Sequence, residues 1–62
     1  MSISDYLQQT RIEYAKELLL NTDQSVSEVA NASGYSNLSY FSSIFKKFTG
    51  SSPGEYRKLR RG

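Results

Sequence analysis

Two short segments of helical pattern meet at Gly34, and this hinge constrains the fold of the chain more than any other feature of its sequence. The first segment opens at Ser25, with Glu28 three residues later, a spacing that lets the two residues cap a helix start reciprocally. Gly34 suits the left-handed backbone that ends a helix and turns the chain. The second segment begins at a serine or asparagine cap at positions 36–37 and stops at the next glycine. The pattern predicts a helix-turn-helix across residues 25–50.

The second segment has two chemically different sides when its residues are placed about 100° apart around a helix. One side is expected to be buried, with Ile44 at its edge, and carries Phe41, Phe45 and Phe48. The opposite side has only small hydroxyls and lysines, at Ser39, Ser42, Ser43, Lys46 and Lys47. Small side chains let a helix backbone approach closely, so this side fits the major groove of DNA. The alternative is that these serines and lysines simply face water.

Charge is unevenly divided along the chain. Residues 1–31 hold five acidic and two basic side chains, whereas residues 32–62 hold six basic and one acidic. The net charge of +2 therefore hides an acidic first half and a basic second half. A basic end fits the phosphate backbone of a nucleic acid, which supplies most of the sequence-independent affinity. The alternative for the basic C-terminal residues is a tail that only improves solubility.

Residues 5–21 form a longer amphipathic pattern, which predicts a first helix with Ser4 as its N-cap. The apolar residues expected to face the core from this helix are Ile3, Leu7, Ile12, Tyr14, Ala15, Leu18 and Leu19. Arg11 lies among them, where an unpaired charge is costly. We expect its stem to pack and its guanidinium to reach a carboxylate, for which Glu28 is one candidate.

The sequence after Gly50 predicts a final helix over residues 53–60, with Ser52 as cap and Pro53 at the first helical position. Tyr56 and Leu59 are expected to anchor this helix on the core. Its bases are expected near the surface and are Arg57, Lys58, Arg60 and Arg61. Four helices and no strand predict a small all-α bundle of the homeodomain-like kind. Its expected core includes Leu7, Leu18, Val29, Ala30, Phe41, Phe45 and Phe48.

Composition limits the possible functions. A chain of 62 residues makes one small domain at most. It contains no cysteine and no histidine, has no glycine-rich phosphate loop, and its acidic residues are scattered. We therefore expect no catalytic site, metal site or cofactor, and no enzyme activity. No apolar run approaches the length of a membrane span, and no signal-peptide pattern opens the chain, so we expect a soluble intracellular protein without membrane contact.

Several motifs occur in a fixed order along nearly the whole chain. They are Arg11-Ile12, Ala15, Leu18-Leu19, Val26, Glu28-Val29-Ala30, Gly34-Tyr35, Tyr40-Phe41, Phe45-Lys46-Lys47, Gly50, Ser52-Pro53 and Tyr56-Arg57. In this order and spacing the chain resembles the C-terminal half of the DNA-binding domain of AraC/XylS-family bacterial transcription regulators.

The resemblance implies a domain of two helix-turn-helix units joined by a long linker helix. Residues 5–21 would be that linker, residues 25–50 the second unit and residues 53–60 the final helix. The first unit is missing, so residues 1–62 are expected to be a single subdomain excised from a longer regulator. The resemblance further implies double-stranded DNA as partner and a bacterial cytoplasmic location at the nucleoid. We expect a monomeric fragment, whereas the full-length protein could form dimers.

Residue roles follow from the resemblance at matching positions. Those implied to face DNA bases, from a helix of about residues 37–49 in the major groove, are Leu38, Ser39, Ser42 and Ser43. Those implied to face phosphates are Tyr40, Lys46, Lys47 and Arg57. Many relatives carry an arginine or another long polar group where this chain has Ser43, and a bidentate arginine on guanine contributes about 1–3 kcal/mol of discrimination. We therefore expect this half to position the protein more than to specify sequence.

A second function class stays open beside DNA binding. The second unit of this family can face other proteins such as RNA polymerase, and a weak base-reading face would leave the surface free for that contact. The chain would then be a helical protein-interaction module with little DNA readout of its own. Titration with short duplex DNA distinguishes the two, because a module that binds only protein does not respond to duplex.

Overall fold

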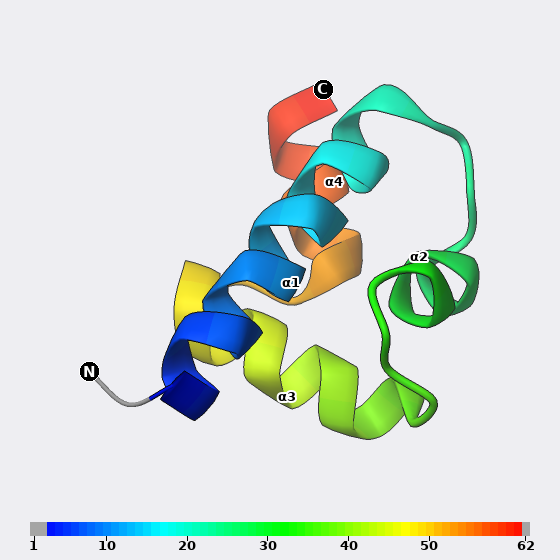
Figure 1. Cartoon of the computed structure of the whole chain (residues 1–62). Helices are drawn as coiled ribbons and strands as arrows, with labels where there is room; N and C mark the ends of the chain where they lie inside the picture. The colour runs from blue at the N-terminus through cyan, green and yellow to red at the C-terminus, as the bar shows by residue number, and fades with distance from the viewer. Residues whose placement is uncertain (1–2, 62) are drawn as a thin grey trace.

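The computed structural model describes residues 3–61, which form four α-helices and no strand (Figure 1). The helices are α1 (Ile3–Asn21), α2 (Val26–Ala32), α3 (Leu38–Thr49) and α4 (Pro53–Arg61). Helix α1 contacts all three other helices and is the central element of the bundle. The all-α prediction is confirmed, and the helices lie close to their predicted ranges.

The start of α2 has the predicted capping box. The Ser25 hydroxyl accepts a hydrogen bond from the Glu28 amide at 3.1 Å, and the Glu28 carboxylate accepts one from the Ser25 amide at 2.9 Å. These bonds satisfy two amides that the helix itself leaves without partners. Both hydrogen bonds with Ser25 lower the pKa of Glu28 from its ordinary value near 4.5, and the bond from the Ser25 backbone has the larger effect.

The turn after α2 closes in a Schellman motif around Gly34, whose φ is +93°. The Tyr35 amide donates to the Ala30 carbonyl at 2.9 Å, and the Gly34 amide donates to the Asn31 carbonyl at 3.1 Å. These are the two bonds that define the motif, and its usual apolar contact is also present because Ala30 and Tyr35 belong to one buried cluster. The turn therefore ends α2 and places the Tyr35 ring in the core.

Helix α3 begins and ends with side-chain and backbone caps. Of the two predicted N-caps, Asn37 is the one used, and its side chain accepts from the Tyr40 amide at 2.9 Å. Gly50 is the C-cap, with a left-handed φ of +85°, and its amide donates to the Lys46 carbonyl at 2.8 Å. Both ends of the helix are therefore determined locally.

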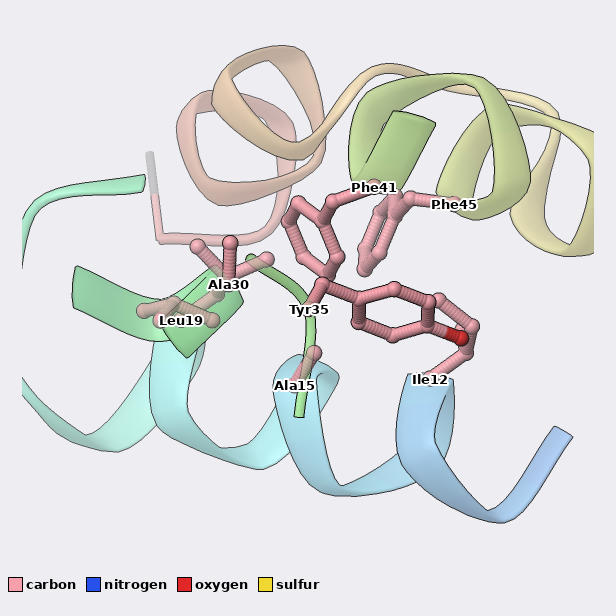
Figure 2. Close-up of a cluster of buried hydrophobic side chains, with 8 residues drawn as sticks. Ile12, Ala15, Leu19, Ala30, Tyr35, Phe41 and Phe45 are labelled. Atoms are coloured by element: carbon pink, nitrogen blue, oxygen red, sulfur yellow. The ribbon is translucent and has the colours of Figure 1, made fainter. Parts of the chain in front are cut away.

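The core lies between α1, α2 and α3, and Figure 2 shows the Tyr35 ring next to Ile12, Phe41 and Phe45. The buried apolar residues are Ile12, Ala15, Leu19, Val29, Ala30, Tyr35, Phe41 and Phe45. Phe41 lies 5.4 Å from Tyr35 and 5.7 Å from Phe45 between ring centroids. Leu18 and Phe48, which were predicted for the core, are partly buried against it.

The predicted buried side of α1 is only partly right. Leu7 and Tyr14 are 50% and 49% exposed, so their placement in the core is wrong. The helix carries large apolar residues on several sides, and its buried side is the one where Ala15 allows close approach of the neighbouring helices. Ser4 lies within α1, so its predicted role as N-cap is also wrong. The prediction for the Ile3 side chain lies outside the described residues.

Arg11 packs against an aromatic ring and does not pair with Glu28. Its guanidinium carbon lies 5.6 Å from the centroid of the Tyr35 ring, a distance at which the ring face attracts a cation. The Glu28 carboxylate instead completes the capping box of α2. The expectations of a Glu28 ion pair and of a place within the core are therefore wrong, because Arg11 is exposed. The expected packing of its stem is confirmed beside Gly34 and Tyr35.

Helix α4 opens as predicted, and one of its two predicted anchors is confirmed. The Ser52 hydroxyl accepts from the Glu55 amide and donates to the Glu55 carboxylate. Tyr56 anchors the helix, with its ring 5.3 Å from that of Phe45 in an edge arrangement. The predicted anchor Leu59 is wrong, because its side chain is 73% exposed. Leu59 lies in the last turn of α4, where residues 58–61 are all exposed.

Candidate nucleic-acid interface

The side of α3 opposite the core forms a polar strip, which we call the outer face and define by Ser39, Ser43, Lys46 and Lys47. All four residues are exposed, whereas Phe41 and Phe45 on the opposite side are fully buried. The phenylalanines therefore fix the rotation of the helix and, with it, the direction of the outer face. Small hydroxyls in the middle of the strip leave the backbone open to close approach.

The four residues predicted to face DNA bases are not equally accessible. Ser39 and Ser43 lie on the outer face, and Leu38 at the start of the helix is 44% exposed. Ser42 is half-buried at the border of the core. The structure thus brings Leu38, Ser39 and Ser43 to the surface and leaves Ser42 only partial access.

The two lysines predicted to face phosphates lie in the last turn of α3. Both are exposed, and the Lys47 ammonium lies 5.9 Å from the centroid of the Phe48 ring. Cations at the C-terminus of a helix are favoured by its macrodipole, so the pair also stabilises α3. Their long stems let the charges extend beyond the serines of the outer face.

Tyr40 lies between the outer face and α1. Its side chain is 50% exposed, and its ring centroid is 6.0 Å from that of Tyr35. The Gln8 side-chain amide of α1 donates to the Tyr40 hydroxyl at 3.0 Å. Gln8 was not identified from the sequence, because nothing in the residues around it indicates a contact with a residue 32 positions away.

Arg57 has a structural role that the sequence did not indicate, because it makes hydrogen bonds between α4 and α1. Its guanidinium donates to the Leu19 carbonyl at 3.0 Å and to the Thr22 carbonyl at 3.3 Å. Arg61 adds a bond to the Thr22 carbonyl at 3.0 Å and an ion pair with Asp23 at 3.1 Å. The two arginines therefore cap the C-terminal end of α1 from α4, and the predicted phosphate role of Arg57 competes with these bonds.

The hydroxyl of Tyr35 is buried, and the Arg11 guanidinium lies 5.6 Å from the centroid of the Tyr35 ring. Burial raises the pKa of this hydroxyl, while the positive charge of Arg11 acts in the opposite direction. Tyr35 therefore stays neutral at physiological pH and serves as the packing residue of the turn. It supports the ring of Tyr40 and, through it, one edge of the outer face.

Helices α2 and α3, joined by the turn at Gly34, have the arrangement of helix-turn-helix DNA-binding domains, in which the second helix is the one that enters the groove. The model of one family, described as a helix-turn-helix domain, matches residues 1–59. The chain belongs to this family, whose type is that of the AraC/XylS regulators, and the predicted resemblance is confirmed.

Individual relatives agree with this family assignment. The chain is 45% identical over 58 residues to the uncharacterized HTH-type transcriptional regulator YijO of Escherichia coli K12, covering 94% of this chain and 20% of that protein. The solved C-terminal domain of AraT, a response regulator from Geobacillus stearothermophilus, is 43% identical with a TM-score of 0.94. That comparison covers 97% of this chain and 50% of the solved one.

A DNA-binding transcriptional dual regulator from Escherichia coli K-12 has the same fold, with 32% identity and a TM-score of 0.90. Its match covers 95% of this chain and 53% of the solved chain. The chain spans about a fifth of the length of the curated relatives it matches. YijO is described as a transcriptional regulator, whereas AdaA of Bacillus subtilis, 33% identical over 61 residues, is described as a bifunctional transcriptional activator and DNA repair enzyme. The match to AdaA covers 98% of this chain and 29% of that protein.

None of the helices within residues 3–61 has the length and apolar character needed to cross a membrane. In that part of the chain no three histidine, cysteine, aspartate or glutamate side chains gather where they could hold a metal ion.

Proposed function

We propose that this chain binds double-stranded DNA by placing α3 in the major groove with the outer face toward the bases. The observation that carries the proposal is the separation of the two sides of α3. Phe41 and Phe45 are fully buried, while Ser39, Ser43 and both lysines are exposed on the opposite side. In helix-turn-helix proteins the second helix enters the groove and its first residues contact base edges.

Phosphate contacts are assigned to Lys46, Lys47 and Tyr40. The two ammonium groups supply charge at the end of α3, and the half-exposed Tyr40 hydroxyl supplies a neutral donor beside α1. Arg57 contributes indirectly in this proposal, because its guanidinium already bonds two carbonyls at the end of α1. Affinity should therefore come mainly from counterion release, which does not depend on sequence.

Base reading is assigned to Leu38, Ser39 and Ser43, with Ser42 as a minor participant because it is half-buried. A serine can both donate and accept a hydrogen bond, so it distinguishes bases poorly, whereas leucine offers only apolar contact with a thymine methyl. The chain should accordingly hold DNA in register with weak sequence preference.

Lysine variants test the proposal through the salt dependence of binding. Anisotropy titrations of a labelled duplex at several salt concentrations would compare the unchanged chain with Lys46→Ala, Lys47→Ala and the control Lys16→Ala. Lys16 carries the same charge on α1, where it pairs with Glu13 at 3.0 Å. Each α3 variant should weaken binding to unrelated duplexes alike and reduce the slope of log affinity against log salt by about 0.9. Equal effects from all three variants would reject the outer face as the DNA-binding surface.

A protein-interaction module is the second candidate, with RNA polymerase as one partner of the kind expected. It is favoured by Leu7 and Tyr14, which are half-exposed and lie about two turns apart on one side of α1, since exposed apolar side chains that gather on one surface mark protein contact sites. Under this alternative the chain would bind a protein partner, and neither the unchanged chain nor its α3 variants would respond to duplex DNA.

Three further proposals concern the full-length protein, its location in the cell and the oligomeric state of residues 1–62. We infer that the chain acts as one subdomain of a longer regulator, as the partial coverage of its relatives supports. The proposed location is the bacterial cytoplasm, where the DNA of such a regulator lies. We propose a monomer for residues 1–62, and sedimentation of the chain with and without duplex would measure its oligomeric state.

A further inference from the structure

Gln8 of α1 and Tyr40 of α3 form a contact between two helices that neither the core nor the caps require. The two residues are 32 positions apart in the sequence, and the distance from the Gln8 side-chain nitrogen to the Tyr40 hydroxyl is 3.0 Å. The bond lies on the exposed side of the bundle, next to the outer face of α3. An exposed hydrogen bond of this kind contributes little to stability, so its main effect is to orient the hydroxyl.

The direction of this bond determines what the Tyr40 hydroxyl can do. A phenolic hydroxyl has one hydrogen to donate and lone pairs that accept. Because Gln8 donates to the oxygen, one lone pair is occupied and the hydroxyl hydrogen stays available for a second partner. The Tyr35 ring at 6.0 Å supports the Tyr40 ring from the core side, so the hydroxyl is held in position by two neighbours.

The surroundings of the hydroxyl favour an anionic acceptor. Tyr40 lies in the first turn of α3, where the positive end of the helix dipole favours negative charge. Lys47 follows seven residues later, about two turns along the same side of the helix. A strand of DNA that passes Lys47 along this side of α3 can therefore present a further phosphate oxygen to the Tyr40 hydroxyl.

We infer that Gln8 is a positioning residue for DNA binding: by donating to the Tyr40 hydroxyl, it leaves the hydroxyl hydrogen free to bond a DNA phosphate. The inference rests on the proposed function, since it adds one phosphate contact to the surface formed by α3. It also makes α1 part of the DNA-binding surface through a residue that does not itself touch DNA.

A double-mutant cycle tests the inference. Anisotropy with a labelled duplex of random sequence at low salt would give dissociation constants for Tyr40→Phe, Gln8→Ala and the combination of both. Tyr40→Phe keeps the ring and removes the hydroxyl, and it should weaken binding about tenfold, the effect of one hydrogen bond to a charged group. Gln8→Ala should weaken binding in the unchanged chain and have no effect in the Tyr40→Phe background. Gln9→Ala is the matched control and should leave the dissociation constant unchanged.

Four results would overturn the inference. Equal weakening by Gln8→Ala in both backgrounds would mean that Gln8 contacts DNA itself. Unchanged binding by Gln8→Ala alone would mean that Gln8 does not position the hydroxyl, and tighter binding would mean that the glutamine carbonyl accepts the hydroxyl hydrogen. An unchanged dissociation constant for Tyr40→Phe would remove the phosphate contact. If Lys46→Ala still weakens binding in any of these cases, the proposed function stands and only the role of Gln8 fails. Melting curves confirm that each variant is folded at the titration temperature.

Discussion

At Gly34 the backbone turns with a φ of +93°, and a Cβ added there would lie 3.4 Å from the Nε atom of Arg11. That distance is ordinary contact, so the penalty for a side chain comes from the left-handed backbone. Gly34→Ala should lower the free energy of unfolding by about 1–2 kcal/mol. Gly54→Ala is the control, because Gly54 has open space around it inside a helix. Thermal melts of both variants measure the effect, and equal losses would contradict a special role for the Gly34 turn.

The capping carboxylate of Glu28 gives a pH-dependent prediction at the same scale. Hydrogen bonds with Ser25 lower its pKa in the folded state, so its stabilising effect is present above the unfolded pKa. That effect is lost as the pH falls through the lowered folded value. Glu28→Gln should therefore be less stable than the unchanged chain at neutral pH, with the difference shrinking in acid. Urea unfolding across the acidic range measures it, and a difference that is constant with pH would count against the capping role.

At the scale of helices, α1 is held to α4 by arginines that bond backbone carbonyls. Arg57 is half-buried and donates to the Leu19 and Thr22 carbonyls at the end of α1. Arg57→Ala should cost about 1.5–3 kcal/mol of unfolding free energy, because hydrogen bonds from a charged donor are among the stronger ones. The neighbouring exposed residue supplies the control, Lys58→Ala, which should change stability by less than about 0.5 kcal/mol. Similar values for the two variants would show that the contact is not structural.

The packing of α3 gives a larger effect. Phe45 is fully buried between the rings of Phe41 and Tyr56, so truncation leaves a cavity that the small core cannot fill. Phe45→Ala should cost about 3–5 kcal/mol, comparable to the total stability of a domain of this size. The variant should be largely unfolded by circular dichroism. A folded variant with an unchanged melting temperature would show that the buried side of α3 is wrongly assigned.

Local chemistry explains which elements could be predicted from the sequence. The starts of α2 and α4 follow from Ser25, Ser52 and their partner glutamates three residues later, and the turn follows from Gly34. The rotation of α1 could not be predicted, because the helix carries apolar side chains on several of its own sides. Only its packing against the other helices decides which of these side chains are buried. Arg57 and Gln8 were missed for a related reason. Their partners lie 38 and 32 residues away, so no sequence window contains both ends of the contact.

For the candidate site, periodicity was enough to predict the outer face of α3, since Phe41 and Phe45 define its opposite side. It was not enough to predict access at Ser42, which depends on how closely α3 packs on the bundle. The engagement of Arg57 in backbone bonds likewise depends on tertiary contacts. The positions nearest the core were therefore the least predictable ones.

At the scale of the whole molecule, the uneven distribution of charge determines which side of the bundle approaches DNA. The bundle measures 34 × 21 × 19 Å, and it combines an acidic first half of the chain with a basic second half. The basic half contains α3, so approach to DNA should be steered toward the outer face, most strongly at low salt. Whether the outer face is the surface that meets DNA is the central question for the molecule.

Amide NMR of the labelled chain, titrated with a short duplex at low and at moderate salt, answers this question most directly. We expect shift changes concentrated on Ser39, Ser43, Lys46 and Lys47, with a smaller response at Tyr40 and none around Glu13 and Lys16 of α1. The changes should diminish at the higher salt concentration, as counterion release requires. Shifts confined to α1, or an outer face that stays silent even at low salt, would contradict the account and favour a protein-binding surface instead.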